Sequence, residues 1–203
     1  MPSVYDLKPR FQALLRPLMA RLARAGFTPN AITLIAVAGS IAVGAALSQA
    51  GERPALLLLL PAWLFARMAL NAIDGMMARE LDMASSLGAV LNELGDALSD
   101  LGLYLPLAFV HKESEWPVVA FSIGAVLTEF CGVLGRALGA SRRYEGPMGK
   151  SDRAFVVGAL GLLSFALPGA VAFWPWIFSI AAALTALTCL NRLSQSLKEL
   201  KAS

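Results

Sequence analysis

Residues 71–100 read NAIDGMMARELDMASSLGAVLNELGDALSD and place ionisable side chains inside two otherwise apolar stretches of the chain. Asn71 and Asp74 are three residues apart, so they share one face of a helix. The second stretch carries a polar stripe at intervals of four residues, made of Gly88, Asn92, Asp96 and Asp100. Ionisable residues within transmembrane helices are costly and usually functional, so this stretch is the candidate site.

The chain around this stretch has the composition of an integral membrane protein. Of its 203 residues, 57% are hydrophobic and 15% are charged, whereas soluble domains average about 45–50% apolar and about 25% charged residues. The apolar residues fall into blocks near the ~20 residues that a helix needs to cross a bilayer. We therefore predict an all-α integral membrane protein with six transmembrane helices, at 28–50, 54–79, 86–110, 116–141, 152–168 and 170–193.

The two ends of the chain differ from this membrane domain, which spans residues 26–195. Residues 1–25 alternate apolar and basic side chains at helical spacing, which predicts a cytoplasmic amphipathic juxtamembrane helix. That helix either lies in the membrane interface or packs on the protein's own cytoplasmic face. Residues 196–203 form a short cytoplasmic tail, and Thr28-Pro29-Asn30 is a helix-start signal for the first span.

The distribution of basic residues predicts the orientation. With six spans, both termini lie on one side, and that side receives nearly all the Lys and Arg residues outside the apolar blocks. The other side receives only Arg53 and Lys112. The positive-inside rule then places both termini and the candidate site in the cytoplasm of a multi-pass plasma (inner) membrane protein.

Oxygen ligands on two facing helices favour a hard divalent cation. Mg²⁺, Mn²⁺ and Ca²⁺ prefer carboxylate and amide oxygens, whereas zinc would require His or Cys nearby. Like charges along one stripe repel, so a cation or a proton is expected to neutralise them. The alternative is an interhelical polar network that holds the bundle together.

At these residues the chain resembles the CDP-alcohol phosphotransferase family, whose signature is D-x2-D-G-x2-A-R-x8-G-x3-D-x3-D. Every spacing agrees, and the first and third aspartates of the signature are asparagine here. The matching residues are Asn71, Asp74, Gly75, Ala78, Arg79, Gly88, Asn92 and Asp96. The length, the six spans and the N-terminal helix are also similar to this family.

The resemblance implies transfer of a phosphatidyl group from CDP-diacylglycerol to a small alcohol, phosphorylated or not, with release of CMP. It implies Mg²⁺ or Mn²⁺ as cofactor, membrane lipids as surroundings, a homodimer, and no nucleic-acid partner. Asp96 would be the general base and a metal ligand, and Asp100 offers a further carboxylate beyond the signature. The other metal ligands would be Asn71, Asp74 and Asn92, and the donor would contact Gly75, Ala78, Arg79 and Gly88.

The sequence leaves alternative roles open for several further charged residues. The basic stretch 135–155 either forms a phosphate-binding rim, with Arg136 and Arg153 as its candidates, or is ordinary positive-inside charge. Glu93 and Glu129 either compensate for the missing aspartates or, for Glu129, form a paired or neutral buried acid.

Two other functions stay open at this point. The asparagines at 71 and 92 are compatible with a degenerate relative that binds nucleotide-lipid or metal without turnover. A metal-ion transporter is weaker, because its carboxylates would have to reach the far leaflet and these cluster near the cytoplasmic half.

Overall fold

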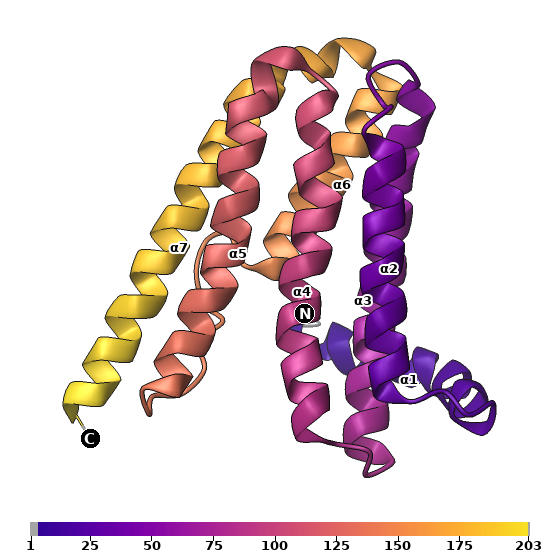
Figure 1. The fold of residues 1–203 in the computed structure, drawn as a ribbon, viewed down its shortest axis with the longest axis vertical. Helices are drawn as coiled ribbons and strands as arrows, with labels where there is room; N and C mark the ends of the chain where they lie inside the picture. The colour runs from indigo at the N-terminus through magenta and orange to yellow at the C-terminus, as the bar shows by residue number, and fades with distance from the viewer. Residues whose placement is uncertain (1–3, 203) are drawn as a thin grey trace.

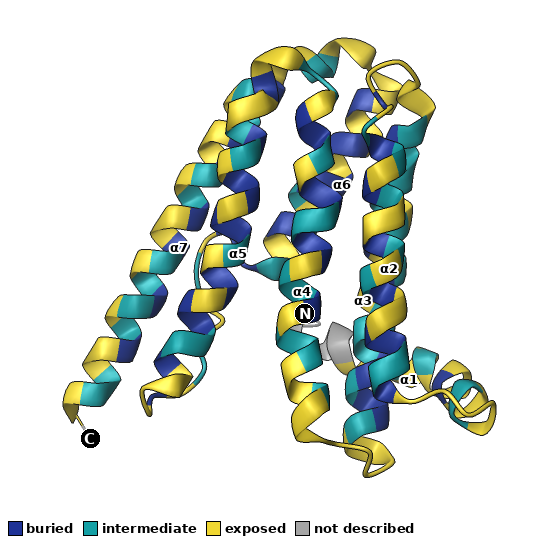
Figure 2. Ribbon diagram, viewed as in Figure 1, coloured by how far each residue is buried: buried dark blue, intermediate teal, exposed yellow. Residues whose placement is uncertain are grey.

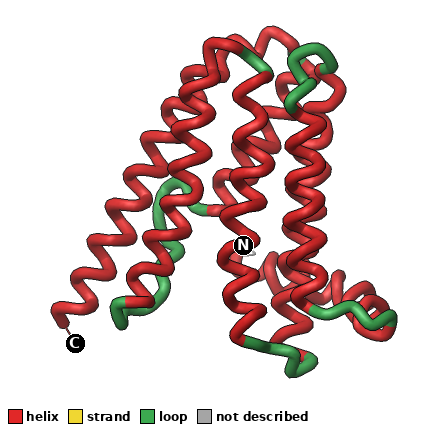
Figure 3. Tube along the Cα trace, in the orientation of Figure 1, coloured by secondary structure: helices red, strands yellow, loops and turns green. Residues whose placement is uncertain are grey.

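The computed structural model describes residues 4–202, with side chains from residue 9 onward; residues 1–3 of the expected N-terminal segment and residue 203 of the tail lie outside it. Every regular element in the described range is helical (Figure 3). The α-helices are α1 (Val4–Arg24), α2 (Pro29–Leu47), α3 (Leu59–Glu80), α4 (Ser86–Tyr104), α5 (Glu115–Ala137), α6 (Lys150–Ala166) and α7 (Trp174–Ala202). Short 3-10 helices connect them: η1 (Pro54–Leu58), η2 (Leu105–Phe109), η3 (Lys112–Ser114) and η4 (Pro168–Phe173).

The all-helical class is confirmed, and a helix occupies each of the predicted spans. Four segments are long and apolar enough to cross a membrane, namely Pro29–Leu47, Pro54–Glu80, Lys112–Ala137 and Pro168–Ala202. The other two helices, α4 and α6, carry the charges of the candidate site. That α4 and α6 also cross the membrane stays a prediction.

The outer surface of the bundle is apolar. In the most apolar part of each candidate span, between 22% and 50% is buried inside the molecule. Figure 2 shows exposed residues running along the outer faces of the long helices, and many of these are Leu, Ile and Phe. An apolar surface of this extent suits hydrocarbon, because soluble monomers rarely expose large contiguous apolar patches.

The helices pack as α2 against α3 and α4, α5 against α7, and α6 against α3. A Cβ atom added at Gly44 would overlap the backbone carbonyl of Gly102, so glycine permits the close approach of α2 and α4. The C-terminal end of α7 and the helix α1 lie at the same end of the bundle, opposite the 3-10 connectors (Figure 1). Because α1 and the C-terminal end of α7 lie at the same end of the bundle, the number of membrane crossings is expected to be even, as it is with six spans.

Helix α1 runs across the lower ends of α2 and α3 (Figure 1). Met19 is buried with Ile32, Ile73, Met76 and Met77, so one side of α1 packs on the protein itself. The other side keeps apolar residues exposed: Leu14 is 76% exposed and Leu18 is 46% exposed. Contact of this second side with the membrane interface stays a prediction.

The connection between α5 and α6, residues 138–149, climbs back between the helices, so α6 begins about halfway up the bundle (Figure 1). Met148 in this re-entrant loop is buried, and its backbone N–H donates to Thr188 Oγ1 at 3.0 Å. Gly149 then starts α6, with its N–H bonded to Asp152 Oδ2 at 2.9 Å. This route brings Lys150 to the polar stripe of α4.

Candidate active site

Most of the signature residues line one cavity of about 290 Å³ between the lower parts of α2, α3 and α4, here called the signature cavity. The start of α2 contributes Thr33, and the re-entrant loop contributes Arg142 and Tyr144. The signature residues in its wall are Asp74, Gly75, Ala78, Arg79, Gly88 and Asn92. The structure therefore brings together the expected donor-binding positions, although they come from two helices separated by a turn.

Two capped helix starts and a glycine in the wall shape this cavity. Thr28 caps α2 by accepting a hydrogen bond from the N–H of Ala31 at 3.2 Å, which confirms the helix-start signal. Ser85 caps α4 in the same way, with the N–H of Gly88 as donor at 3.0 Å. A Cβ atom on Gly88 would lie 2.9 Å from Asn30 Oδ1, so a larger residue here would close the wall of the cavity.

Asp74 and Asp96 are the two signature carboxylates, and they have different partners. Asp74 is buried and accepts a hydrogen bond from Thr33 Oγ1 at 2.8 Å. Asp96 is partly exposed, and its Oδ1 accepts from Asn71 Nδ2 at 3.3 Å and forms an ion pair with Lys150. Among the described residues, no hydrogen bond reaches Asp96 Oδ2, so this oxygen is available to a ligand.

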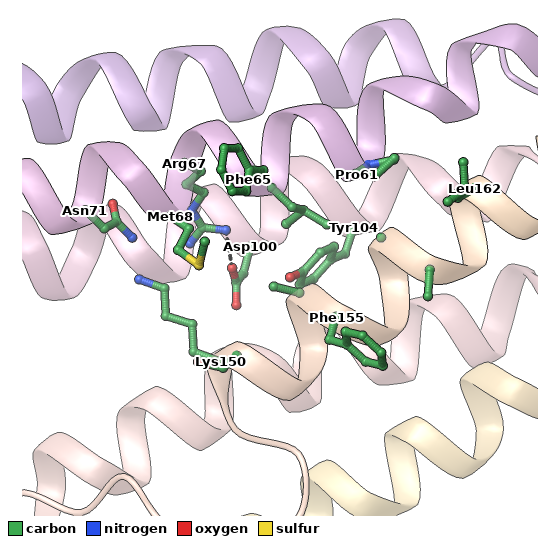
Figure 4. Close-up of a pocket in the computed structure, with 15 residues that line it drawn as sticks. Pro61, Phe65, Arg67, Met68, Asn71, Asp100, Tyr104, Lys150, Phe155 and Leu162 are labelled. Carbon is green, nitrogen blue, oxygen red and sulfur yellow. Dashed lines mark hydrogen bonds and ion pairs between the residues drawn. The ribbon is translucent and has the colours of Figure 1, made fainter. Parts of the chain in front are cut away.

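A second cavity of about 620 Å³ lies between α3, α4 and α6, here called the α3–α6 groove. Figure 4 shows Arg67, Asn71, Asp100 and Lys150 pointing toward one another at its polar end. Tyr104 and Ser151 also line the groove, and the remaining lining is apolar: Pro61, Leu64, Phe65, Met68, Ala154, Phe155, Gly158, Ala159 and Leu162. A largely apolar groove with a polar end has the chemistry to accept a lipid.

Asp100 lies one turn beyond Asp96 but belongs to a buried ion-pair network. Its Oδ1 accepts from Arg67 at 2.5 Å, and its Oδ2 accepts from Arg153 at 2.8 Å. Both oxygens are thus used inside the protein, and the side chain is 2% exposed. This geometry does not support the expectation that Asp100 binds a metal.

Arg153 is fully buried at the centre of the same network. Besides Asp100, it donates to Glu129 Oε1 at 2.8 Å and Thr128 Oγ1 at 2.8 Å. Arg153 lines neither cavity, so its contacts do not support the expected role in phosphate binding. Glu129 adopts the second of its two readings, that of a paired buried acid.

Two further arginines hold the re-entrant loop. Arg192 of α7 donates to the backbone carbonyls of Tyr144 and Glu145, which satisfies loop groups that have no helical partners, and to the carbonyl of Thr128 in α5. Arg143 pairs with Glu199 and with Glu145. Arg136 is exposed at the end of α5 and lines neither cavity.

The acidic residue of the loop is stabilised as a carboxylate. Partial burial alone would raise the pKa of Glu145. The backbone N–H groups of Glu145 and Tyr144 and the charge of Arg143 outweigh burial, so the pKa lies below its ordinary value. Glu145 therefore keeps its negative charge and its contact with Arg143 at neutral pH.

The residues fit a divalent cation of the Mg²⁺ or Mn²⁺ type. Mg²⁺ is usually held by one or two carboxylates together with waters and substrate phosphates, rather than by an all-protein cage. Asp74 and Asn92 share the wall of the signature cavity, and Asn71 contacts Asp96 at 3.3 Å, so these residues supply two carboxylates and two amide groups. Within the described residues no three His, Cys, Asp or Glu side chains form a metal cluster, which agrees with the loss of two signature aspartates.

Sequence reasoning missed Arg67, and it placed Lys150 only in the basic stretch 135–155 without its contact to Asp96. Arg67 is 3% exposed in α3 and bonds to Asp100 and to the backbone carbonyl of Asp96. The sequence could have indicated Arg67, because an ionisable residue within an apolar span is a candidate functional residue. Lys150 gave no such signal, because only the re-entrant path of the loop brings it to Asp96.

Comparison with known proteins agrees with this geometry. Residues 27–189 match the family model for CDP-alcohol phosphatidyltransferase. The chain is 45% identical over 190 residues to the inner membrane protein YnbA of Escherichia coli, covering 94% of each chain.

Two crystal structures of phosphatidylinositol phosphate synthase from Mycobacterium tuberculosis share the fold. One has CDP-DAG bound, with a TM-score of 0.76 and 22% identity over 89% of this chain and 92% of that one. The other is a complex with manganese and citrate, with a TM-score of 0.77 and 21% identity over 89% of this chain and 88% of that one.

Proposed function

The chain belongs to the CDP-alcohol phosphatidyltransferase family, and from this premise we propose that it transfers a phosphatidyl group from CDP-diacylglycerol to a small alcohol and releases CMP. The observation that carries the proposal is the convergence of six signature residues on one cavity, with Asp96 one helical turn beyond Asn92 of its wall on α4. The related mycobacterial synthase binds CDP-DAG and manganese, which supports the same donor and cofactor class here.

The two cavities suit the two halves of the donor. The signature cavity has a wall without side chains at Gly75 and Gly88, and Arg79 on its rim makes no ion pair with the described residues. We assign the cytidine and the diphosphate to this cavity, with Arg79 toward the diphosphate. The α3–α6 groove, which is largely apolar, is assigned to an acyl chain.

Asp96 is positioned to act on the acceptor. The acceptor hydroxyl attacks the phosphatidyl phosphorus, the bond to CMP breaks, and the hydroxyl proton passes to Asp96 Oδ2. Lys150 and Asn71 both contact the other oxygen, Oδ1, so they orient the carboxylate with Oδ2 outward. General-base catalysis of this kind typically contributes about 10²–10⁴ in rate.

A divalent cation would be held by Asp74 and Asp96 with the amide oxygens of Asn71 and Asn92. When bound, it would polarise the diphosphate and stabilise the charge on the leaving CMP. The choice between Mg²⁺ and Mn²⁺, the homodimer, and the cytoplasmic side of the site remain predictions.

The Asp96→Asn variant tests the role of Asp96. We expect CMP release to fall about 10²- to 10⁴-fold while the Kd for CDP-diacylglycerol changes much less, because the amide keeps the shape and loses the basicity. The exposed Glu52, in the connector at the other end of the bundle, supplies the matched control Glu52→Gln. Unchanged CMP release in Asp96→Asn would remove Asp96 from the chemistry.

A further inference from the structure

We propose that the acceptor is an alcohol without a phosphate group, such as a polyol or an amino alcohol. The inference rests on the proposed function, since it names the acceptor class of the same site. The basic stretch 135–155 predicts a phosphate-binding rim, but four of its five cations, Arg142, Arg143, Lys150 and Arg153, are paired with carboxylates of the chain. The fifth, Arg136, is exposed and lines neither cavity.

The cationic side chains that line the two cavities are Arg67, Arg79, Arg142 and Lys150. Three of them have carboxylate partners. Arg67 pairs with Asp100, Lys150 with Asp96, and Arg142 with Glu93 at 2.6 Å. Among the described residues only Arg79 has none, and the diphosphate of the donor accounts for its charge.

The arginines behind the cavity walls also have partners within the protein. Arg153 is enclosed by Asp100 and Glu129 at 2.8 Å each. Arg192, 2% exposed, uses its donors on backbone carbonyls of the helix α5 and the loop. A second phosphate would have to displace these internal partners, and it would then face their unpaired negative charges.

The carboxylates themselves favour a different acceptor. Glu93 lies in the wall of the signature cavity with its side chain 29% exposed. It can accept hydrogen bonds from the hydroxyl or ammonium groups of an uncharged or cationic alcohol. A phosphate at the same place would meet a like charge in a site of low dielectric, which disfavours its ionised form.

Matched acceptor pairs test the inference with the wild-type protein in lipid nanodiscs, CDP-diacylglycerol and Mn²⁺. The pairs are glycerol with glycerol 3-phosphate and inositol with inositol 1-phosphate, supplemented by serine and ethanolamine. We expect CMP release with an unphosphorylated alcohol, about tenfold or more above any phosphorylated one. Faster release with the phosphorylated member of either pair overturns the inference and leaves the proposed function standing.

Binding of inorganic phosphate supplies a readout that needs no turnover. It is measured by calorimetry with CDP-diacylglycerol present, so that Arg79 is engaged. Besides Glu93, Arg142 has Glu129 Oε2 within 3.4 Å, so the double variant Glu93→Gln/Glu129→Gln removes both carboxylate partners of Arg142. Wild type should bind phosphate at least about tenfold more weakly than this variant, and Glu52→Gln is the control.

Phosphate binding by wild type that equals binding by the double variant contradicts the inference. If no acceptor releases CMP, the proposed function fails and the inference about its acceptor fails with it, whatever the binding comparison shows. If the double variant does not fold, the acceptor pairs decide it with the wild-type protein.

Discussion

Asp96 and Asp100 lie one helical turn apart on α4, yet their surroundings give them different tasks. Asp96 is partly exposed and keeps Oδ2 free of hydrogen bonds from the described residues. Asp100 is buried between Arg67 and Arg153. The first therefore suits chemistry, and the second suits the support of the helices around it.

The Asp100→Asn variant separates these tasks. Removing one partner of a buried ion pair costs about 3–5 kcal/mol, because it leaves an uncompensated buried charge. We expect a clearly lower Tm for Asp100→Asn in detergent, with the affinity of the folded protein for Mn²⁺ nearly unchanged. The opposite pattern, an unchanged Tm with lost Mn²⁺ affinity, would return Asp100 to the metal ligands.

At the scale of elements, the re-entrant loop between α5 and α6 decides where the cations of the site lie. Gly146 has a φ of +140°, and a Cβ atom there would overlap Thr188 of α7. Arg192, also on α7, then fixes the loop through the carbonyls of Tyr144 and Glu145. Together these contacts start α6 at Lys150, beside Asp96.

The Arg192→Lys variant tests this support. Lysine keeps the charge but is a point donor that does not reproduce the planar fork of arginine, so the loop loses carbonyl partners. We expect faster proteolytic cleavage within residues 138–149 and lower CMP release, with the helical circular dichroism spectrum preserved. Lys198→Arg, at an exposed position on the same helix, is the control. Cleavage and CMP release at the wild-type rates would show that the loop does not depend on Arg192.

The sequence allowed the helices to be predicted better than their contacts. Apolar length located a helix in each predicted span, four of which are long and apolar enough to cross a membrane, and Thr28 marked the start of α2 correctly. The ends were less accurate, because prolines at 54, 106 and 168 convert the connecting segments into 3-10 turns that hydropathy merges with the spans.

The polar residues of the signature were found from their helical spacing, and the roles of Gly75, Ala78, Arg79 and Gly88 came from the resemblance to the family signature. The partners of the polar residues were not found in either way. Arg67 and Lys150 reach Asp96 or Asp100 across helices, and one-dimensional periodicity contains no information about such pairing. For the same reason, the basic stretch 135–155 suggested a phosphate rim, whereas Arg142, Arg143 and Arg153 are paired with carboxylates of the chain.

At the scale of the whole molecule, the bundle separates a site end from a connector end. The C-terminal end of α7 and the helix α1 share the site end (Figure 1), and in each of the four candidate spans at least half of the most apolar part is not buried inside the molecule. Together with the positive charge of that end, this arrangement favours a site that opens to the cytoplasm.

Cysteine labelling in intact cells tests this orientation. In a background with Cys131→Ser and Cys189→Ser, single cysteines are introduced at the exposed positions Lys112 and Lys201. We expect a membrane-impermeant maleimide to label Lys112→Cys in intact cells and Lys201→Cys only after permeabilisation. The reverse pattern would invert the predicted topology.

The most direct test of the account is CMP release by the purified wild-type protein in nanodiscs that contain CDP-diacylglycerol, with the acceptor alcohols described above and with Mn²⁺ or EDTA. The account predicts release that requires both an acceptor and the metal, is abolished by EDTA, and yields a phosphatidyl-alcohol product. Bound CDP-diacylglycerol without CMP release under any acceptor would contradict it and would show that the site with Asn71 and Asn92 binds the donor without turning it over.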